Sequence, residues 1–393
     1  LLNNQKTKLN IFINQNKYTS INNQEREDFL NTRLIYNQRV FKNIVESDLF
    51  FETNSGNLPQ QEYTFLEVEP GLGSYKWIDI NGNNIQELEE FEIAVFEDEG
   101  RYIRVLLPNQ IFIRTYQNKL NYSLKFNFLK WKNSGKGIKK FFSRISNQLQ
   151  YSIDKKTNLD INPKIELNPF QIDENSLLAF NYSLKNIFYL NKAQQRYSLV
   201  FTYAENKSKN DFSFGSTKIS NNTKKINLIH KLSELYLLEI IGNKNKKSSW
   251  SENFDDKNYN LDEYNLNPKF TYLMVDNNRI NFIYKISNIK NSLGQEESLK
   301  QQNFGLSLYL NQKEKKGFIS EFNYYKNDFD GDANSLISYV MMNGLQNGEN
   351  YTWSFRLQRK LSKLLDINFI YLGRKSKNSR TIHNGSIQLK AIF

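Results

Sequence analysis

The residues of this chain that are best suited to chemistry are oxygen ligands in an acidic stretch near residue 80. Asp79, Asn81 and Asn83 stand at positions 1, 3 and 5 of a short loop, and Glu90 stands at position 12. Side-chain oxygens at this spacing, closed by a bidentate acid, match the loops that hold Ca²⁺ through six to eight oxygens. Position 6, where such loops carry glycine, is Asn84, and asparagine tolerates the left-handed backbone needed there. The loop is a candidate calcium site.

The residue that closes this candidate calcium loop is not fixed by the spacing alone. The apolar Ile85 stands at position 7 and not at position 8, so the loop can be one residue shorter and closed by Glu89. Glu87 lies within the same stretch and completes the candidate ligand set. The competing interpretation is an Asn- and Gly-rich turn between two strands.

A second cluster of acids provides a weaker metal candidate. Asp328, Asp330 and Asp332 alternate with other residues and offer oxygens at the same 1-3-5 spacing. No clear closing acid follows them, and calcium coordination needs more oxygens than these three groups supply. The competing interpretation is a solvated loop tip.

Composition excludes several classes of protein. The 393 residues contain no cysteine, so a disulfide scaffold, a thiolate zinc site and a cysteine nucleophile are all excluded. Only two histidines are present, and no Ser-His-Asp grouping can be argued, so we expect no catalytic site. The net charge is +12, but the lysines are scattered through short stretches such as 242–247, and we expect no nucleic-acid partner.

Alternation of apolar and polar residues is the strongest pattern in the sequence. Leu120, Tyr122, Leu124, Phe126 and Phe128 alternate with Asn, Ser and Lys, and the same period of two recurs along the chain. Successive side chains of a strand point to opposite faces, so each segment has one apolar and one polar face. From residue 119 onward this pattern predicts strands at 119–131, 143–154, 177–189, 197–204, 224–232, 235–242, 265–275, 280–288, 302–310, 317–326, 351–360, 364–373 and 382–393.

Two architectures satisfy such strands: a soluble sandwich with its apolar faces inside, and a transmembrane barrel with its apolar face on lipid. Several predicted strands reach about 10 residues, the length of a membrane-spanning strand. The connections alternate between short and long, as they do in outer-membrane barrels, whereas a sandwich has no reason to sort its loops this way. The predicted short connections are 132–142, 190–196, 233–234, 276–279, 311–316 and 361–363, and the long ones are 155–176, 205–223, 243–264, 289–301, 327–350 and 374–381.

Three upstream segments at 7–14, 32–42 and 48–55 fit the same alternation of loop lengths and bring the expected strand count to about 16. The expected fold is therefore all-β: an antiparallel up-and-down transmembrane β-barrel with a small extracellular β-rich insert. The insert is strongly acidic, with eleven acids and one base in residues 62–100. The expected organisation is first barrel strands in 1–56, the acidic extracellular insert with its calcium-type loop in 57–118, and C-terminal barrel strands in 119–393.

The last predicted strand places Ile387, Leu389, Ala391 and Phe393 on one face. It resembles the terminal assembly signal of bacterial outer-membrane barrels, which ends in an aromatic residue. The segments 75–91 and 344–353 also resemble large, functionally uncharacterised outer-membrane proteins, over about the last 330 residues. The resemblance implies the bacterial outer membrane as location, outer-membrane lipids and the assembly machinery as partners, and possible protein partners at the cell surface. The start of the chain without methionine suggests either a removed signal peptide or, as the favoured interpretation, the C-terminal part of a longer protein.

The resemblance brings no activity, so function is argued from the polar face. Arg356, Gln358 and Lys125 are candidate lumen-facing residues, because lumen side chains set the selectivity of a barrel. We expect a channel or a component of transport across the outer membrane. The first alternative is a non-conducting barrel that anchors a calcium-binding surface module for adhesion or complex assembly. A soluble basic all-β binding protein remains a further alternative.

Overall fold

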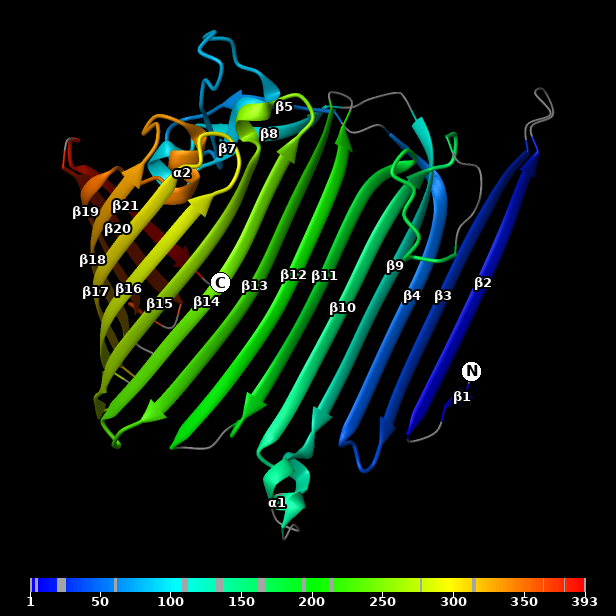
Figure 1. Ribbon diagram of the computed structural model, residues 1–393, viewed down its shortest axis with the longest axis horizontal. Coiled ribbons are helices and arrows are strands. Elements are labelled where there is room, and N and C mark those ends of the chain that lie inside the picture. The colour runs from blue at the N-terminus through cyan, green and yellow to red at the C-terminus, as the bar shows by residue number, and fades with distance from the viewer. Residues whose placement is uncertain are drawn as a thin grey trace.

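The chain folds into two separate antiparallel sheets, a large one of long strands and a small one above it (Figure 1). No helix within the described part of the chain has the length and apolarity needed to cross a membrane. This computed structural model describes residues 2–3, 6–19, 26–59, 62–107, 112–131, 137–161, 167–192, 196–212, 215–275, 278–312, 316–362, 364–377 and 379–391.

The large sheet is an up-and-down meander in which each long strand pairs with the next long strand along the chain. In the described residues it contains 16 strands of 10 to 17 residues, the number that the sequence predicts, and the two-residue strand β1 (Leu2–Asn3) at its edge. The long strands are β2 (Thr7–Thr19), β3 (Arg26–Val40), β4 (Val45–Pro59), β9 (Phe112–Asn127), β10 (Ile145–Asn158), β11 (Leu177–Leu190), β12 (Tyr197–Phe212), β13 (Gly215–Lys231), β14 (Tyr236–Ser251), β15 (Tyr259–Leu273), β16 (Arg279–Asn291), β17 (Ser298–Gln312), β18 (Lys316–Asp330), β19 (Gly348–Lys360), β20 (Leu365–Ser376) and β21 (Ile382–Ala391).

Alternation gives this sheet two unlike faces. The convex face carries exposed apolar side chains such as Phe201, Ile226 and Leu266, which lie opposite one another or nearly so on neighbouring strands. A sheet that exposes its large apolar residues to the outside requires an apolar surrounding there. The convex face is therefore suited to contact with lipid.

The concave face carries the polar residues, which bond to one another across strands. Thr271 and Asn281 are joined at 2.8 Å between Oγ1 and Oδ1, and the Asn281 amide donates to Ser307 Oγ at 2.8 Å. Farther along, the Gln301 amide donates to Asn327 Oδ1 at 2.9 Å. These ladders satisfy polar groups that would be costly to bury without partners.

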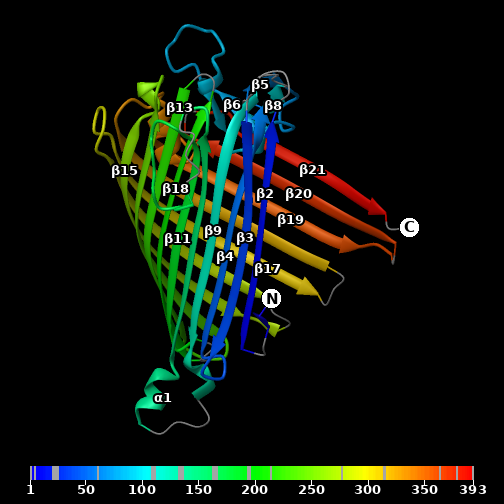
Figure 2. The ribbon, with the colours of Figure 1, turned by 90° about the vertical axis from the view of Figure 1, so that its right-hand side faces the viewer.

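The large sheet curls strongly but is open between its first and last strands (Figure 2). Within the described residues β21 does not pair with β2, so the predicted closed barrel is correct in connectivity but not in closure. Part of the edge of β2 is occupied, because Leu9 and Lys8 pair with Leu2 and Asn3 of β1. A closing strand would need the backbone groups at these positions for its own hydrogen bonds.

The predicted long loops are shorter than the sequence suggests. Segment 205–223, expected as a loop, is largely strand, because β12 runs to Phe212 and β13 begins at Gly215. Likewise β14 and β15 take up most of 243–264. A strand of 16 residues tilted by about 40° rises roughly 40 Å, whereas the apolar band of such barrels is only about 25 Å tall. The strands therefore extend beyond their apolar part, and their polar ends lack the alternation that marks the rest.

The small sheet lies within the acidic insert and has the strand order β5 (Glu62–Glu67), β8 (Tyr102–Leu107), β6 (Tyr75–Trp77), β7 (Phe91–Ile93). Its core is aromatic: Phe65 stacks on Phe91 with ring centroids 4.1 Å apart, and Tyr102 meets Phe91 edge-on at 4.9 Å. Two short 3₁₀ helices, η1 (Leu88–Glu90) and η2 (Glu97–Glu99), complete the insert. The insert therefore has a small core of its own.

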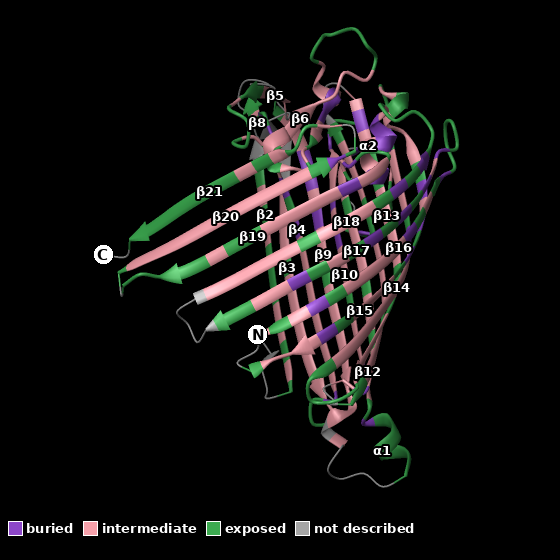
Figure 3. Cartoon of the chain, turned by 90° about the vertical axis from the view of Figure 1, so that its left-hand side faces the viewer, coloured by how far each residue is buried: buried purple, intermediate pink, exposed green. Residues whose placement is uncertain are grey.

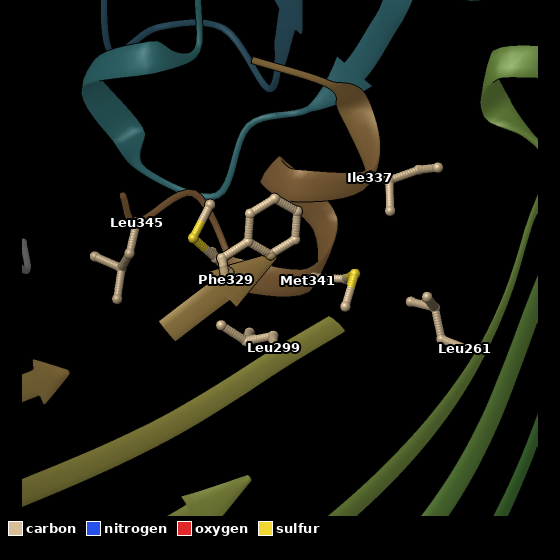
Figure 4. Close-up of a cluster of buried hydrophobic side chains, with 7 residues drawn as sticks. Leu261, Leu299, Phe329, Ile337, Met341 and Leu345 are labelled. Carbon is tan, nitrogen blue, oxygen red and sulfur yellow. The ribbon is translucent and has the colours of Figure 1, made fainter. Parts of the chain in front are cut away.

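The connection between β18 and β19 forms a helix, α2 (Leu336–Met342), which lies beside the insert at the long-loop end of the sheet (Figure 1). Ser335 caps its N-terminus by accepting a bond from the Ser338 amide. Figure 4 shows the apolar cluster beneath this helix. The cluster contains Leu261, Leu299, Phe329, Ile337, Met341, Met342 and Leu345, and Phe96 of the insert packs against it.

The distribution of burial follows from these contacts. Buried residues gather where α2 meets the sheet, whereas the far ends of β19 and β21 are exposed (Figure 3). At the opposite, short-turn end, the connection between β9 and β10 contains η3 (Phe128–Trp131) and the short helix α1 (Ile138–Phe142). Among the described residues, burial is therefore concentrated at the long-loop end, where the insert lies.

Candidate functional site

The insert is fastened to the sheet by a buried ion-pair cluster. Arg374 of β20 donates a hydrogen bond from Nη1 to Asp98 Oδ1 and another from Nη2 to Glu99 Oε1, the latter at 3.0 Å. Its side chain is only 14% exposed, and its guanidinium carbon lies 3.9 Å from the centre of the Phe96 ring. A charge-assisted bond with limited solvent access is among the stronger polar contacts of a protein. Arg374 therefore joins η2 of the insert to the concave face.

Tyr339 of α2 provides a second fastening to the same segment. Its hydroxyl donates to Glu99 Oε2 at 2.8 Å and accepts the backbone N–H of Val95 at 3.0 Å. Lys76 of β6 lies 3.6 Å from Glu99 Oε2 and 4.5 Å from the centre of the Tyr339 ring. Burial raises the pKa of Tyr339 above the usual tyrosine value, and the bond to Glu99 raises it further. The phenol therefore stays protonated, as its role as donor requires.

Further contacts extend the attachment around the mouth of the sheet. Lys257, in η4 (Asp255–Lys257) between β14 and β15, lies 2.6 Å from Glu92. The Asn384 amide of β21 donates to Glu97 Oε2 at 3.2 Å. Acidic side chains of the insert thus contact basic and amide side chains on elements that are far apart in the sequence.

A cavity of about 270 Å³ lies between the insert and the concave face. It is lined by residues 95–98 of the insert and by polar residues of β18 to β21, among them Glu321, Arg356 and Arg374. Arg356, a candidate lumen-facing residue, thus lines this cavity, and Gln358 lies two residues farther along the same face of β19. Both candidate residues of β19 belong to this wall.

A second cavity, of about 310 Å³, adjoins the first through Glu321 and Asn323. The Tyr309 hydroxyl donates to Glu321 Oε1 at 3.1 Å, and the Arg279 guanidinium lies 4.3 Å from the centre of the Tyr309 ring. Lys269 also lines this cavity and is ion-paired with Glu239. The wall therefore offers both signs of charge along a continuous polar surface.

The opposite wall carries rows of alternating charge that sequence reasoning missed. Arg33, Glu52, Lys119 and Asp154 lie directly opposite one another on β3, β4, β9 and β10. The Arg33 and Glu52 side chains are in contact at 2.5 Å, and those of Lys119 and Asp154 at 3.9 Å. Only the pairing of strands reveals such a row, although the alternation within each strand could have marked its members as lumen-facing.

Lys125, the third lumen candidate, lies in a parallel row on the same wall. It is opposite Glu46 of β4 and Gln148 of β10, and Glu46 in turn is opposite Arg39 of β3. Lys125 and the two candidates of β19 are thus on the same face of the sheet but on different walls. The structure does not bring them into one site.

The candidate calcium loop folds around its own backbone. Asp79 accepts the amides of Gly82 at 2.8 Å and Asn84 at 3.0 Å, and Asn84 has the left-handed φ of 57° that the loop needs. The Asn81 and Asn83 side chains accept the amides two residues farther on. These three groups therefore gather at the loop, as the spacing predicts.

Glu90, the predicted closing ligand, is directed elsewhere. It is fully buried, its Oε2 accepts Trp77 Nε1 at 2.8 Å, and its Oε1 accepts the Ile80 amide at 3.1 Å. Glu87 reaches the loop instead, where it accepts the Asn81 amide at 2.8 Å. The side-chain oxygens gathered at the loop are therefore those of Asp79, Asn81, Asn83 and Glu87, without Glu90.

The second acidic cluster is divided between a strand and a turn. Asp328 and Asp330 belong to β18, opposite Lys300 and Ser298 of β17, whereas Asp332 follows the strand and accepts the Asn334 amide at 2.9 Å. No group of three or more His, Cys, Asp and Glu side chains suited to a metal occurs in the described parts of the chain. The terminal assembly signal also cannot be located, since Phe393 lies outside the described residues.

These faces and connections define a class of protein. An antiparallel meander with an apolar convex face and a polar concave face pairs its backbone from strand to strand, except at its two open edges, and lipid requires such pairing of a spanning structure. This is the construction of bacterial outer-membrane β-barrel proteins. The sequence resemblance to bacterial outer-membrane barrels and the expected location in the bacterial outer membrane agree with this construction.

Comparison with solved structures finds similar chains. The FrpB iron transporter from Neisseria meningitidis (F3-3 variant) aligns with 98% of this chain at 9% identity and a TM-score of 0.48. CdiB from Acinetobacter baumannii aligns with 98% at 10% identity and a TM-score of 0.38. The ferric-catecholate import receptor Fiu from E. coli K12, in its open form, aligns with 95% at 8% identity and a TM-score of 0.40.

The chain spans only 59%, 60% and 61% of the lengths of these three proteins, in that order. No family model and no curated protein matches the sequence. The assignment to a class therefore rests on the faces and connections of the sheet itself.

Proposed function

We propose that this protein takes part in the passage of polar solutes across the outer membrane, and that its insert caps the mouth of the polar interior on the extracellular side. The observation that carries this proposal is the fastening of Asp98 and Glu99 to Arg374 above the cavity of about 270 Å³. A lumen of mixed charge suits hydrated, polar cargo better than apolar cargo. The side chains that line the two cavities carry both signs of charge: Arg356, Arg279 and Lys269 are basic, and Glu321 is acidic.

The cap regulates access, because its contacts to the sheet are polar and partly exposed to solvent. Salt weakens ion pairs of this kind. A cap held in this way can open without unfolding the sheet. The polar walls then form the path.

The test is single-channel conductance of the full chain, refolded in detergent and inserted into a planar bilayer. We expect the Asp98→Asn/Glu99→Gln variant to open more often than the original protein, because it loses both partners of Arg374. The control is Glu174→Gln/Glu296→Gln, which removes the same charge from exposed carboxylates paired with Lys218 and Lys290. If both variants opened equally often, the result would contradict a cap at this position.

The second candidate is a non-conducting barrel that anchors the insert as a surface module. The separate aromatic core of the insert favours it, because a unit with its own core can present a binding surface. Silence of the original protein and of the opened variant, in samples with intact β-structure, would support this candidate and overturn transport.

A further inference from the structure

Two lysines face each other on the convex side of the large sheet, where the apolar band ends. Lys224 of β13 is directly opposite Lys244 of β14. Lys224 lies two residues from Ile226, where the apolar band of β13 begins, and Lys244 lies four residues from Ile240 of β14, with Gly242 between them on the same face. Both side chains therefore stand on the lipid-facing side, at its boundary toward the long-loop end.

This arrangement is unfavourable in isolation. Like charges directly opposite each other on neighbouring strands repel, because the side chains are only about 5 Å apart at their base. In the described part of the chain, no carboxylate is ion-paired with either Lys224 or Lys244. Lys244 bonds to the neutral Tyr264 hydroxyl and lies 4.6 Å from the centre of that ring. The pair thus lacks an anion.

The nearby acidic side chains on this face are ion-paired with other lysines. Asp262 lies 3.4 Å from Lys246, and Glu205 lies 2.9 Å from Lys207. Farther toward the loops, Glu174 lies 2.8 Å from Lys218. These ion pairs surround the Lys224–Lys244 pair with further ammonium groups, and each nearby carboxylate already has a partner.

Aromatic residues place the pair at a defined depth. The row across the sheet reads Tyr203, Lys224, Lys244 and Tyr264 on four consecutive strands. The row below it, toward the short-turn end, contains Phe201, Ile226 and Leu266, which are 41%, 50% and 48% exposed. Tyrosine at the edge of an apolar band marks the membrane interface, where one side of the ring meets acyl chains and the hydroxyl meets headgroups.

We propose that Lys224 and Lys244 bind the phosphate of a membrane-lipid headgroup in the leaflet on the long-loop side. A phosphate between the two ammonium groups supplies the missing anion, and the Ile226 and Leu266 row accommodates the acyl chains of the same molecule. This inference rests on the membrane location of the sheet, but it does not require that the interior conduct. The occupant is a lipid and not a soluble anion, because the apolar surface continues directly below the charges.

The test measures lipid binding to the full chain in zwitterionic detergent micelles. The probe is a fluorescent phosphatidate, compared with a phosphatidylcholine of the same acyl chains and with inorganic phosphate. We expect Lys224→Gln/Lys244→Gln to weaken phosphatidate binding by about 30-fold, since each lysine near a membrane surface contributes about fivefold. Binding of phosphatidylcholine should be unchanged.

The matched control is Lys156→Gln/Lys225→Gln, which removes two lysines from the concave face of β10 and β13. Equal weakening in control and test variants would overturn the proposal, because it would reflect net charge alone. Competition by inorganic phosphate at the concentration of the lipid would also overturn it, since the site would then be one for free anions.

Conductance separates this proposal from the proposed function. Lipid binding that depends on Lys224 and Lys244, in a protein that never conducts, would support the headgroup site and reject the open interior. Normal conductance in a protein whose lipid binding ignores both lysines would reject the headgroup site alone.

Discussion

Replacement of Arg374 by glutamine should release the insert from the sheet without unfolding either. Among the described residues, Arg374 alone bonds both Asp98 and Glu99, and the three side chains are 14%, 28% and 16% exposed. Loss of one partner from a buried ion pair costs about 3–5 kcal/mol, whereas an exposed pair is worth about 0–1 kcal/mol. For this intermediate exposure we expect docking to weaken by about 2 kcal/mol, or about 30-fold in the undocked population.

Hydrogen–deuterium exchange can follow the undocking at single amides. The Val95 N–H donates to the Tyr339 hydroxyl, so it is protected only while the insert is docked. The Ile78 N–H donates to the Glu90 carbonyl within the insert, so it is protected as long as the insert is folded. We expect exchange at Val95 to accelerate about 30-fold in Arg374→Gln, with Ile78 unchanged.

The matched control is Arg39→Gln, which breaks an ion pair with Asp48 on the opposite wall, far from the insert contacts. A double-mutant cycle with Glu99→Gln should give a coupling free energy of about 1–3 kcal/mol. Unchanged Val95 exchange in Arg374→Gln would refute the reasoning, and faster exchange at both Val95 and Ile78 would show that the insert unfolds instead of undocking.

Three further predictions concern other parts of the molecule. Gly373→Ala should lower thermal stability by about 1–3 kcal/mol, measured from heat-modifiable gel mobility, because an added Cβ would lie 2.2 Å from the Trp353 ring; an unchanged midpoint would contradict this close approach. Burial raises the pKa of Tyr63 to about 12. The protonated phenol should therefore stabilise the insert fully below pH 10, and this part of the free energy of unfolding should be lost between pH 10 and 12. A Tyr63→Phe variant whose stability falls by the same amount over this range would disprove the assignment. Calcium should bind the insert in a calorimetric titration, and Asp79→Asn should abolish the binding heat. Glu90→Gln should chiefly destabilise the insert, because Glu90 accepts hydrogen bonds from Trp77 and Ile80. Calcium binding that persists in Asp79→Asn would reject the loop as the site.

The strands of the sheet were predictable because their signal is local. Period-two alternation is written into each segment, and a backbone in extended conformation converts it directly into two faces. The predicted ranges overlap all 16 long strands of the described residues, and Arg356, Gln358 and Lys125 lie on the polar face. The strand ends were less predictable, because segments such as 205–223 are polar on both faces and read as loop.

The site at the mouth could not be predicted in the same way. Arg374 and Asp98 are separated by 276 positions in the sequence, and nothing in their local surroundings indicates that they meet. The direction of Glu90 was missed for a related reason: position 12 of a calcium-type loop fixes a spacing, but the nearby Trp77 indole and Ile80 amide compete for the same carboxylate.

The sequence by itself determined the strand number, the alternating faces and the acidic character of the insert, because each is a property of a continuous segment. The tertiary structure decided which acids meet which bases, where the cavities lie, and that β1 extends the edge of β2 while β21 stays apart from it in the described residues. Those features depend on strand register and on the curl of the sheet. They arise from the sum of many pairings, and no single segment encodes them.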